Sequence, residues 1–289
     1  MSRSTSTLIY WIRRYLAQFL AQKAKIMATF ITSSLVLWLA LSSQLGWAAG
    51  NNAASAANRD GQRSDDLTMQ ALAAAAEPTE VVWLETVDQP FLSLYRPAVD
   101  AAQMAIILLP GQLHHMADGG LMQTLYRELP IAGWSALQVA LPAQLNQHVN
   151  GLDNDTRHQR AINRTNQAVS HMMAQGAGST ALIAGNLSAQ VAIDIAIARS
   201  EITSGLVLWQ LDQRLLSSDK LQQLASSQIT LLDILPVGLT EQDKINRRRQ
   251  FQLAGFGQNY RQITAPDGRA SIRYNSRRIQ EWVATEFLK

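Results

Sequence analysis

The sequence contains no cysteine, and this absence removes several kinds of chemistry. Disulfide bonds, a thiolate nucleophile and cysteine-ligated metal sites are all excluded. Two further absences are regional: residues 1–49 contain no acidic residue, and residues 172–289 contain no histidine. The lack of acidic residues in 1–49 bears on the cellular location of the protein. The lack of histidine in 172–289 limits the catalytic groups that the fold can bring together.

Charge is unevenly distributed along the chain. The formal net charge is +3, but residues 1–49 hold five basic residues, which leaves 20 basic against 22 acidic residues in 50–289. Nucleic-acid binding requires a basic folded domain, so nucleic acid is not an expected partner. Residues 244–289 hold ten Lys and Arg against three acidic residues. We interpret this region as helices with solvated basic faces; the alternative is a surface that meets anionic lipid or polysaccharide.

Residues 1–48 have the organisation of an export signal. A basic segment precedes an uncharged apolar stretch from Ile26 to Leu41, which is shorter than the roughly 20 residues of a full membrane span. Gly46 and Ala48 place small residues at the −3 and −1 positions of a cleavage after Ala48. We predict a signal peptide or, if it is not cleaved, a signal anchor giving membrane association. Both send the rest of the chain across the inner membrane.

The remainder of the chain reads as a linker followed by one α/β domain. Residues 49–78, rich in Ala, Asn, Ser and Gly, are predicted to be a flexible linker with a short helix over 67–76. Beyond it, apolar runs alternate with helical spacing. Predicted strands cover 80–84, 91–95, 105–109, 136–141, 179–184, 206–209, 229–235 and 260–264, and predicted helices cover 121–129, 160–175, 190–199, 220–225, 247–254 and 272–287. This order predicts, for residues 79–289, a mainly parallel, doubly wound sheet flanked by helices, with an edge hairpin first and a loop over 143–158.

The junction of strand 179–184 with the next helix has the form of a nucleophile elbow. Gly185, Asn186, Leu187, Ser188 and Ala189 occupy the five positions of the G-x-S-x-G turn that raises a serine above an α/β sheet. Leu187 stands at the position of the nucleophile, and Ala189 replaces the second glycine. The turn is therefore predicted to be kept without its reactive group.

Five short motifs follow one another along the domain: Leu108-Leu109-Pro110-Gly111, Gly133-Trp134-Ser135-Ala136-Leu137, Leu141-Pro142, Leu232-Asp233-Ile234 and Arg277-Arg278-Ile279-Gln280-Glu281-Trp282. Together with the order of the strands and helices, they resemble the α/β-hydrolase superfamily. They are more narrowly similar to an uncharacterised Gram-negative family, domain of unknown function 3530, over about residues 80–289. The resemblance implies an α/β-hydrolase-like fold and a place in the cell envelope, in the periplasm. It implies no activity, because that family has none established.

A catalytic triad is difficult to assemble from this sequence. Ser188 is adjacent to the nucleophile position, and we expect it to cap the following helix instead. Asp233 could occupy the acid position, but it has no histidine to orient and is expected to cap or to pair with an arginine. In this fold the base follows the acid, whereas all five histidines precede residue 172. They are His114, His115, His148, His158 and His171.

Other chemistry has little support in the sequence. His114 and His115 follow the first core strand, where hydrolases place oxyanion-hole residues, so a pocket-lining role competes with exposure in a loop. Asp153 and Asp155 are spaced as in a calcium loop but lack its glycine and terminal glutamate. No G-x-G-x-x-G or P-loop is present. No metal and no cofactor is therefore predicted.

Three functional hypotheses remain open. The first is a non-catalytic, periplasmic α/β-hydrolase-like protein that acts by binding. The second is an ester hydrolase with an unconventional site that uses Ser188 or His114 on a lipid or glycan ester, with Asp233 as a further candidate residue. The third is a membrane-tethered envelope factor whose basic C-terminal face, including Arg247, Arg248 and Arg249, meets anionic partners. Fold alone does not choose among them.

Overall fold

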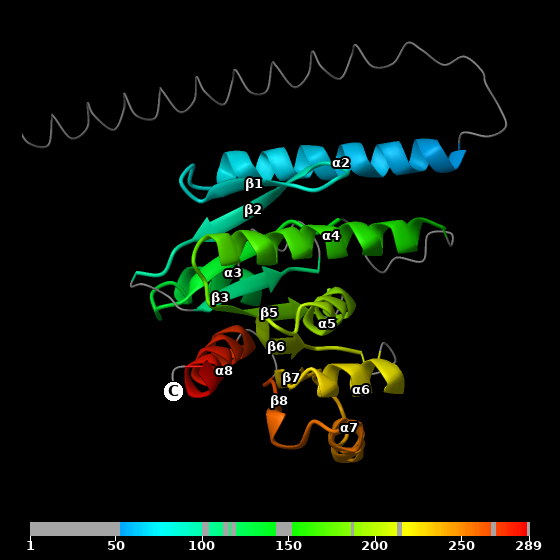
Figure 1. Ribbon diagram of the computed structural model, residues 1–289, viewed down its shortest axis with the longest axis vertical. Helices are drawn as coiled ribbons and strands as arrows, with labels where there is room; N and C mark the ends of the chain where they lie inside the picture. Colours follow the sequence, from blue (N-terminus) through cyan, green and yellow to red (C-terminus); the bar gives the residue numbers. More distant parts are fainter. Residues whose placement is uncertain are drawn as a thin grey trace, which may run out of the picture. The chain divides into compact units, whose positions relative to one another are not determined.

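An eight-stranded sheet runs through the described part of the chain (Figure 1). The computed structural model describes residues 53–99, 104–111, 116, 120–142, 152–185, 188–212, 216–266 and 270–287. The predicted export signal lies outside these residues. The strands are β1 (Val81–Glu85), β2 (Pro90–Arg96), β3 (Met104–Leu109), β4 (Ser135–Val139), β5 (Ser179–Gly185), β6 (Thr203–Trp209), β7 (Thr230–Leu235) and β8 (Tyr260–Thr264).

The strand order is β1-β2-β4-β3-β5-β6-β7-β8. β1 and β2 form the predicted antiparallel hairpin, with Trp83 opposite Leu92, and β2 is antiparallel to β4. All other neighbouring strands are parallel. The prediction of a mainly parallel, doubly wound sheet is therefore confirmed.

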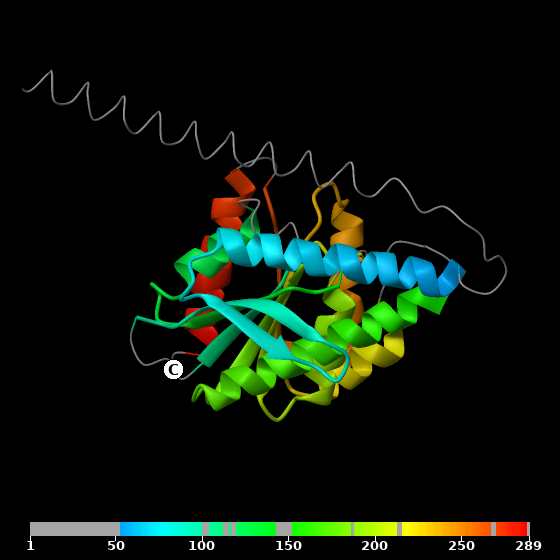
Figure 2. The same cartoon turned by 90° about the horizontal axis from the view of Figure 1, so that it is seen from above.

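Helices cover both faces of the sheet (Figure 2). They are α2 (Ala53–Ala75), α3 (Leu121–Glu128), α4 (Leu152–Ala174), α5 (Ala189–Ala198), α6 (Ser218–Ser226), α7 (Glu241–Ala254) and α8 (Ala270–Phe287), with a short 3-10 helix η3 (Gly257–Asn259). On one face α3 packs beside α8, where the Glu128 carboxylate accepts hydrogen bonds from Ser276 and Gln280. On the other face α4, α5 and α6 follow one another.

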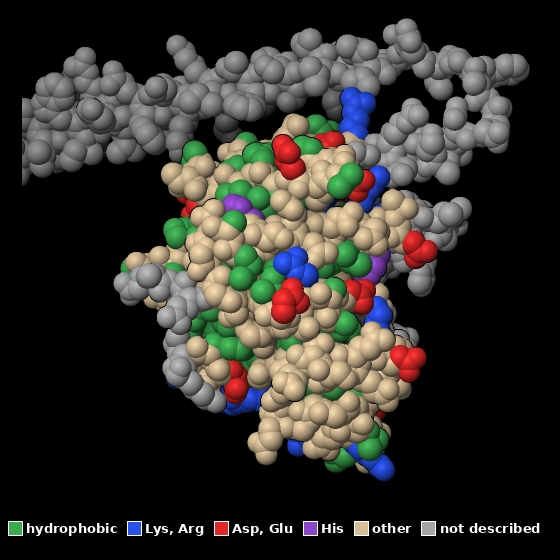
Figure 3. All heavy atoms as spheres, in the orientation of Figure 1, with side chains coloured by type: hydrophobic (Ala, Val, Ile, Leu, Met, Phe, Trp, Pro, Cys, Tyr) green, Lys and Arg blue, Asp and Glu red, His purple; other side chains and the backbone are tan. Residues whose placement is uncertain are grey.

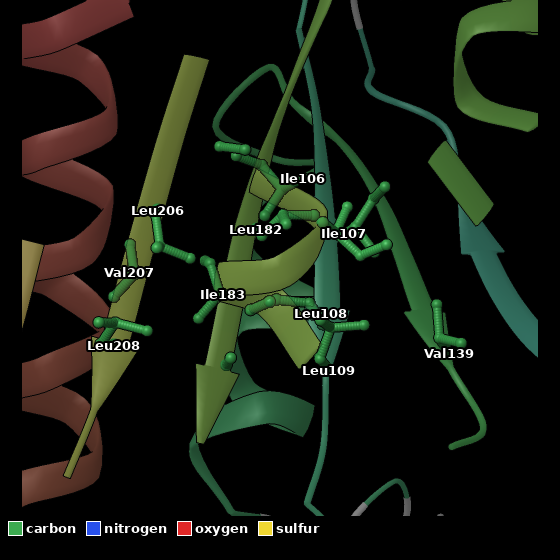
Figure 4. Close-up of a cluster of buried hydrophobic side chains, with 14 of the residues drawn as sticks. Ile106, Ile107, Leu108, Leu109, Val139, Leu182, Ile183, Leu206, Val207 and Leu208 are labelled. Carbon is green, nitrogen blue, oxygen red and sulfur yellow. The ribbon is translucent and has the colours of Figure 1, made fainter. Parts of the chain in front are cut away.

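The central strands are buried on both faces, as their continuous apolar composition predicts. Every residue of β3 is buried, and its side chains lie beside those of β5, with those of β6 on the far side of β5 (Figure 4). Ile107 and Leu182 are opposite one another in the parallel pairing of β3 with β5. Trp282 and Val283 of α8 are also almost fully buried, so the C-terminal helix belongs to the core.

The predicted linker differs most from the structure. The short helix predicted over 67–76 is present, but it is the end of one continuous helix over residues 53–75, where a flexible segment was predicted. Met69 on this helix is 1% exposed, and its Sδ accepts a hydrogen bond from the backbone N–H of Leu92 at 3.4 Å. Leu72 and Ala76 also pack against the core. The helix is therefore held by an apolar stripe that contacts the sheet at its β1–β2 end.

Two other helices are longer than the sequence pattern predicted. Residues 152–158, placed in a loop, are the first two turns of α4. α7 begins at Glu241 instead of residue 247, because Thr240 and Asp243 form a reciprocal capping box. Residues 153–158 and 241–244 are all polar in sequence, so they form no apolar stripe from which either helix start could be predicted.

Candidate functional site

The elbow joins the end of β5 to the start of α5. β5 ends at Gly185 and α5 begins at Ala189, so the predicted strand–turn–helix context is present. Asn186 and Leu187 lie outside the described residues. Ser188 is described and is completely buried. The site can therefore be judged through Ser188 and its partners.

The hydroxyl of Ser188 binds backbone carbonyl groups. Its Oγ donates to the carbonyl oxygen of Leu109 at 2.5 Å and lies 3.3 Å from that of Gly185. The prediction that Ser188 caps the amides of α5 is wrong, since its side chain makes no capping hydrogen bond. Its φ of −103° and ψ of −2° are helical, whereas a capping residue is normally extended. The hydrogen bond to Leu109 shows that the side chain is directed towards the end of β3.

The backbone amide of Ser188 is also engaged. In a working elbow, the N–H after the nucleophile helps to stabilise the oxyanion. Here the N–H of Ser188 donates to the carbonyl oxygen of Gly185 at 3.0 Å. Both donor groups of this residue therefore already have protein acceptors.

Asp233 lies inside the sheet, as the fourth residue of β7, and is fully buried. Arg247 of α7 donates to both of its oxygens, from Nε to Oδ2 at 2.7 Å and from Nη2 to Oδ1 at 2.8 Å. The hydroxyl of Tyr260 donates to Oδ2 at 2.8 Å. Burial and the negative charge of Asp233 raise the pKa of Tyr260. The expectation that Asp233 pairs with an arginine is confirmed.

The contact between Arg247 and Asp233 removes one arginine from the predicted basic C-terminal face. Arg247 is 1% exposed and directs its remaining nitrogen, Nη1, to the carbonyl oxygen of Leu211 at 2.8 Å. It is unavailable to an anionic surface, unlike Arg248 and Arg249, which are exposed. On the face drawn in Figure 3, acidic and basic side chains are interspersed. A basic surface on this helix thus rests on two arginines instead of three.

The described histidines, His158 and His171, lie on α4 and contact residues of neighbouring elements. His158 Nε2 is 2.9 Å from Asp194 Oδ2 on α5, and Lys220 Nζ on α6 donates to the other oxygen of Asp194 at 2.6 Å. Burial opposes ionisation of Asp194, but the two hydrogen bonds outweigh it and lower its pKa. His171 meets Tyr95 edge-on, with ring centroids 6.1 Å apart, and burial lowers its pKa. These contacts tie helices to each other and to the sheet.

Three predicted candidates fall outside the described residues: His114, His115 and His148. Asp155 is exposed on α4, so the spacing that resembled a calcium loop lies on a helix. Among the residues that the structure describes, no cluster of three His, Asp or Glu could hold a metal ion. Within the same residues, every helix is too short or too polar to cross a bilayer.

A pocket between α2, β2 and α3 was not predicted from the sequence. Its volume is about 480 Å³, and we call it the α2–α3 pocket. Glu80 in its wall accepts a hydrogen bond from Arg96 Nε at 2.7 Å and another from the Tyr126 hydroxyl at 2.8 Å. The signal that could have revealed it is the helical spacing of Met69, Leu72 and Ala76 within the supposed linker.

Comparison with solved structures assigns the fold. The chain is similar to Est1E from Butyrivibrio proteoclasticus, with a TM-score of 0.55 and 8% identity over 73% of this chain and 100% of that one. It is similar to the dienelactone hydrolase of Anabaena variabilis, with a TM-score of 0.54 and 13% identity over 71% and 96%. A serine hydrolase without a lid from Xanthomonas campestris gives 0.52 and 13% over 71% and 93%. The fold is therefore that of the α/β hydrolases.

A family model gives a narrower match. The model of the protein family of unknown function DUF3530 matches residues 30–152. This match supports the resemblance drawn from the β3–β4 region, and it ends before the elbow. No curated protein matches the chain.

Proposed function

We propose that this chain is a non-catalytic α/β-hydrolase-like protein that acts in the periplasm by binding. The observation that carries the proposal is the state of Ser188, whose hydroxyl and amide both donate to backbone carbonyl groups. A serine nucleophile needs a base to accept its proton and a free path to the substrate carbonyl. Within the described part of the chain, the Ser188 hydroxyl is buried and contacts the carbonyl oxygens of Leu109 and Gly185 instead of a base.

The other triad positions support the same proposal. Leu187 occupies the nucleophile position and has no group that can attack a carbonyl. Asp233 is neutralised by Arg247 inside the sheet, so its carboxylate is not available to orient an imidazole. The chain has no histidine after His171, although the base follows the acid in this fold.

The test is labelling of the purified full chain with a fluorophosphonate, beside an active serine esterase as positive control. A panel of short and long acyl esters is assayed in parallel, with the Ser188→Ala variant as the matched control. We expect no labelling and no turnover above that of the variant. Labelling that maps to Ser188, together with turnover that the variant loses, would reject the proposal and favour the ester-hydrolase alternative.

The periplasmic part of the proposal rests on the basic and apolar composition of residues 1–48. Alkaline phosphatase fused after residue 60 reports export directly, because the enzyme is active only outside the cytoplasm. A fusion lacking residues 1–48 is the control. N-terminal sequencing of the exported protein then distinguishes cleavage after Ala48 from retention as an anchor. If the fusion that retains residues 1–48 showed no phosphatase activity, the export assignment would be contradicted.

A further inference from the structure

The sheet has two open edges, β1 at one end and β8 at the other (Figure 1). Among the described residues, each of these strands pairs on one side only, β1 with β2 and β8 with β7. An unpaired edge presents a row of backbone N–H and C=O groups to which another strand can bind. Both edges are therefore surfaces that a further strand could cover.

Alternate residues of β1 direct their backbone groups away from β2. The Glu80 carbonyl oxygen, just before β1, accepts a hydrogen bond from the Tyr95 N–H at 2.8 Å, so residue 80 faces β2. This direction alternates from one residue to the next along an antiparallel strand. The residues of β1 that face outward are therefore Val81, Trp83 and Glu85.

The outward residues of β8 follow from its pairing with β7. The Ile234 carbonyl oxygen accepts a hydrogen bond from the Gln210 N–H at 2.8 Å on the β6 side, so the backbone of Asp233 faces β8. Asp233 is opposite Gln262, and in a parallel ladder it bonds to the residues on either side of that position. The residues of β8 that face outward are therefore Tyr260, Gln262 and Thr264.

The two edges carry charges of opposite sign. Residues 76–95, which include β1, contain four acidic residues and no Lys or Arg. Residues 244–264, which include β8, contain five basic residues and no acidic one. The exposed charged residues are Glu77, Glu85 and Asp88 near β1, and Arg248, Arg249 and Arg261 near β8.

These charges select which edges can meet. Two β1 edges would bring acidic side chains together, and two β8 edges would bring arginines together, so repulsion opposes both pairings of like edges. A β8 edge beside a β1 edge brings opposite charges together. The complementary partner of the β8 edge is thus the β1 edge of a second copy of the chain.

A groove between α7 and β8 leaves room for a side chain of an added strand. Its volume is about 200 Å³, and its wall includes Ile245, which is 57% exposed, and Gln262. Two charged residues of the wall, Glu241 and Lys244, pair with each other at 2.7 Å. Arg248, also in the wall, makes no ion pair with another described residue. The groove therefore offers a partner one apolar surface and one cation.

Antiparallel pairing brings an apolar side chain to this groove. Gln262 lies on the α7 side of the sheet, since its Nε2 donates to the Lys244 carbonyl oxygen at 3.3 Å. Residues directly opposite one another in an antiparallel pair have their side chains on the same side. With Trp83 of the second copy opposite Gln262, its indole, which is 45% exposed in the single chain, lies on the side of Ile245.

The same register brings an acidic side chain towards Arg248. Two residues along, it places Glu85 of the second copy opposite Tyr260. Phe251 of α7 stacks on Tyr260 with ring centroids 4.3 Å apart, so α7 runs from Ile245 towards Tyr260, and Arg248 lies in that direction. The apolar and the charged features of the two edges therefore match in one register.

From these features we propose that the β8 edge of one copy binds the β1 edge of a second copy as an antiparallel strand, so that the sheet continues from one molecule to the next. The interface is heterologous, and a dimer still has one free edge of each kind, so longer oligomers can form. The inference goes beyond the proposed function, because it names an interaction surface and a partner that do not involve the elbow.

The experiment follows self-association of the purified full chain by sedimentation velocity over a range of protein concentrations. The wild-type chain should form dimers and longer oligomers as its concentration rises, and fewer of them at high salt, which screens exposed charges. Glu85→Lys/Asp88→Lys reverses the acidic edge, and Arg248→Glu/Arg261→Glu reverses the basic edge. Each variant alone should need at least about tenfold more protein to associate, because attraction at the interface becomes repulsion.

Mixing the two variants tests which edges meet. An equal mixture brings the basic edges of one variant to the acidic edges of the other, so association should return to the wild-type level. Glu201→Lys/Asp219→Lys is the matched control, because it makes the same change in net charge at exposed positions away from both edges, and it should associate like the wild-type chain. Circular dichroism checks that each variant is folded.

Four outcomes would overturn the proposal. They are a wild-type chain that stays monomeric, association that neither variant weakens, association that only one variant weakens, and folded variants that do not recover association on mixing. A monomeric wild-type chain that bound anionic vesicles through Arg248 and Arg261 would assign the basic edge to a membrane instead. Fluorophosphonate labelling reports on the elbow alone, so this proposal and the proposed function can fail independently.

Discussion

Arg247 holds Asp233 through two parallel hydrogen bonds, and both side chains are almost completely excluded from water. The pair joins α7 to β7 and also fixes the hydroxyl of Tyr260 on β8. Buried ion pairs of this kind are costly to break, because removing one member leaves the other charge without compensation.

Arg247→Met is therefore expected to lower the free energy of unfolding by about 3–5 kcal/mol. The double variant Asp233→Leu/Arg247→Met should recover much of this loss, because it leaves no buried charge. Urea denaturation followed by circular dichroism measures both. Glu281→Gln, which removes an exposed ion-pairing group on α8, is the control and should change little. A double variant as unstable as the single one would contradict this account.

Ser188→Ala tests whether the elbow serine is structural. Loss of the hydrogen bond to the buried Leu109 carbonyl is expected to cost about 1–3 kcal/mol of unfolding free energy. Ser226→Ala, on the exposed side of α6, is the matched control and should cost less than about 0.5 kcal/mol. Equal stability of the two variants in urea would show that the Ser188 hydroxyl does not support the fold.

Met69→Ala tests whether α2 belongs to the folded unit. The substitution removes a core side chain and should cost about 2–5 kcal/mol. Leu67→Ala changes a residue of the same helix that is 61% exposed, so it should have little effect. Thermal and urea denaturation of the two variants provide the comparison. If α2 were only a linker, the two variants would be equally stable.

His171 predicts a pH dependence of stability. Burial against Tyr95 lowers the pKa of the folded histidine below its ordinary value of 6.5, so the unfolded chain takes up the proton more readily. Stability should therefore fall as the pH drops through about 6.5 and should level off once the folded histidine is also protonated. Urea midpoints at pH 7.5 and 5.5 measure the change. His171→Phe keeps an aromatic contact with Tyr95 and should reduce the difference; an unchanged difference would contradict this assignment.

The sheet was predictable because its central strands are buried on both faces. Residues 104–109 are apolar throughout, and such a run has few alternatives to a core strand. Only the C-terminal part of α2 was predicted, as a short helix over 67–76, because the apolar stripe of Met69, Leu72 and Ala76 lies there and the preceding residues 53–66 have no such stripe. Residues 153–158, at the start of α4, are all polar and therefore give no apolar stripe that a pattern search could detect.

The site could be predicted only in part, because its decisive contacts are distant in sequence. That Asp233 would need an arginine follows from the cost of burying a carboxylate, but its choice of Arg247 depends on how α7 packs. The acceptor of the Ser188 hydroxyl is Leu109, 79 residues earlier, which no local pattern could identify. The α2–α3 pocket required three elements to be placed together.

The contact between α3 and α8 has a consequence for the order in which the protein can be completed. Glu128 accepts hydrogen bonds from Ser276 and Gln280, which are separated from it by about half of the chain. A chain delivered from its N-terminus has therefore exposed the apolar side of α3 long before α8 arrives to cover it. Docking of the last helix therefore completes the fold. A chain that stops before residue 270 is expected to leave the apolar side of α3 uncovered, and to be bound by chaperones or degraded by proteases instead of forming a smaller stable domain.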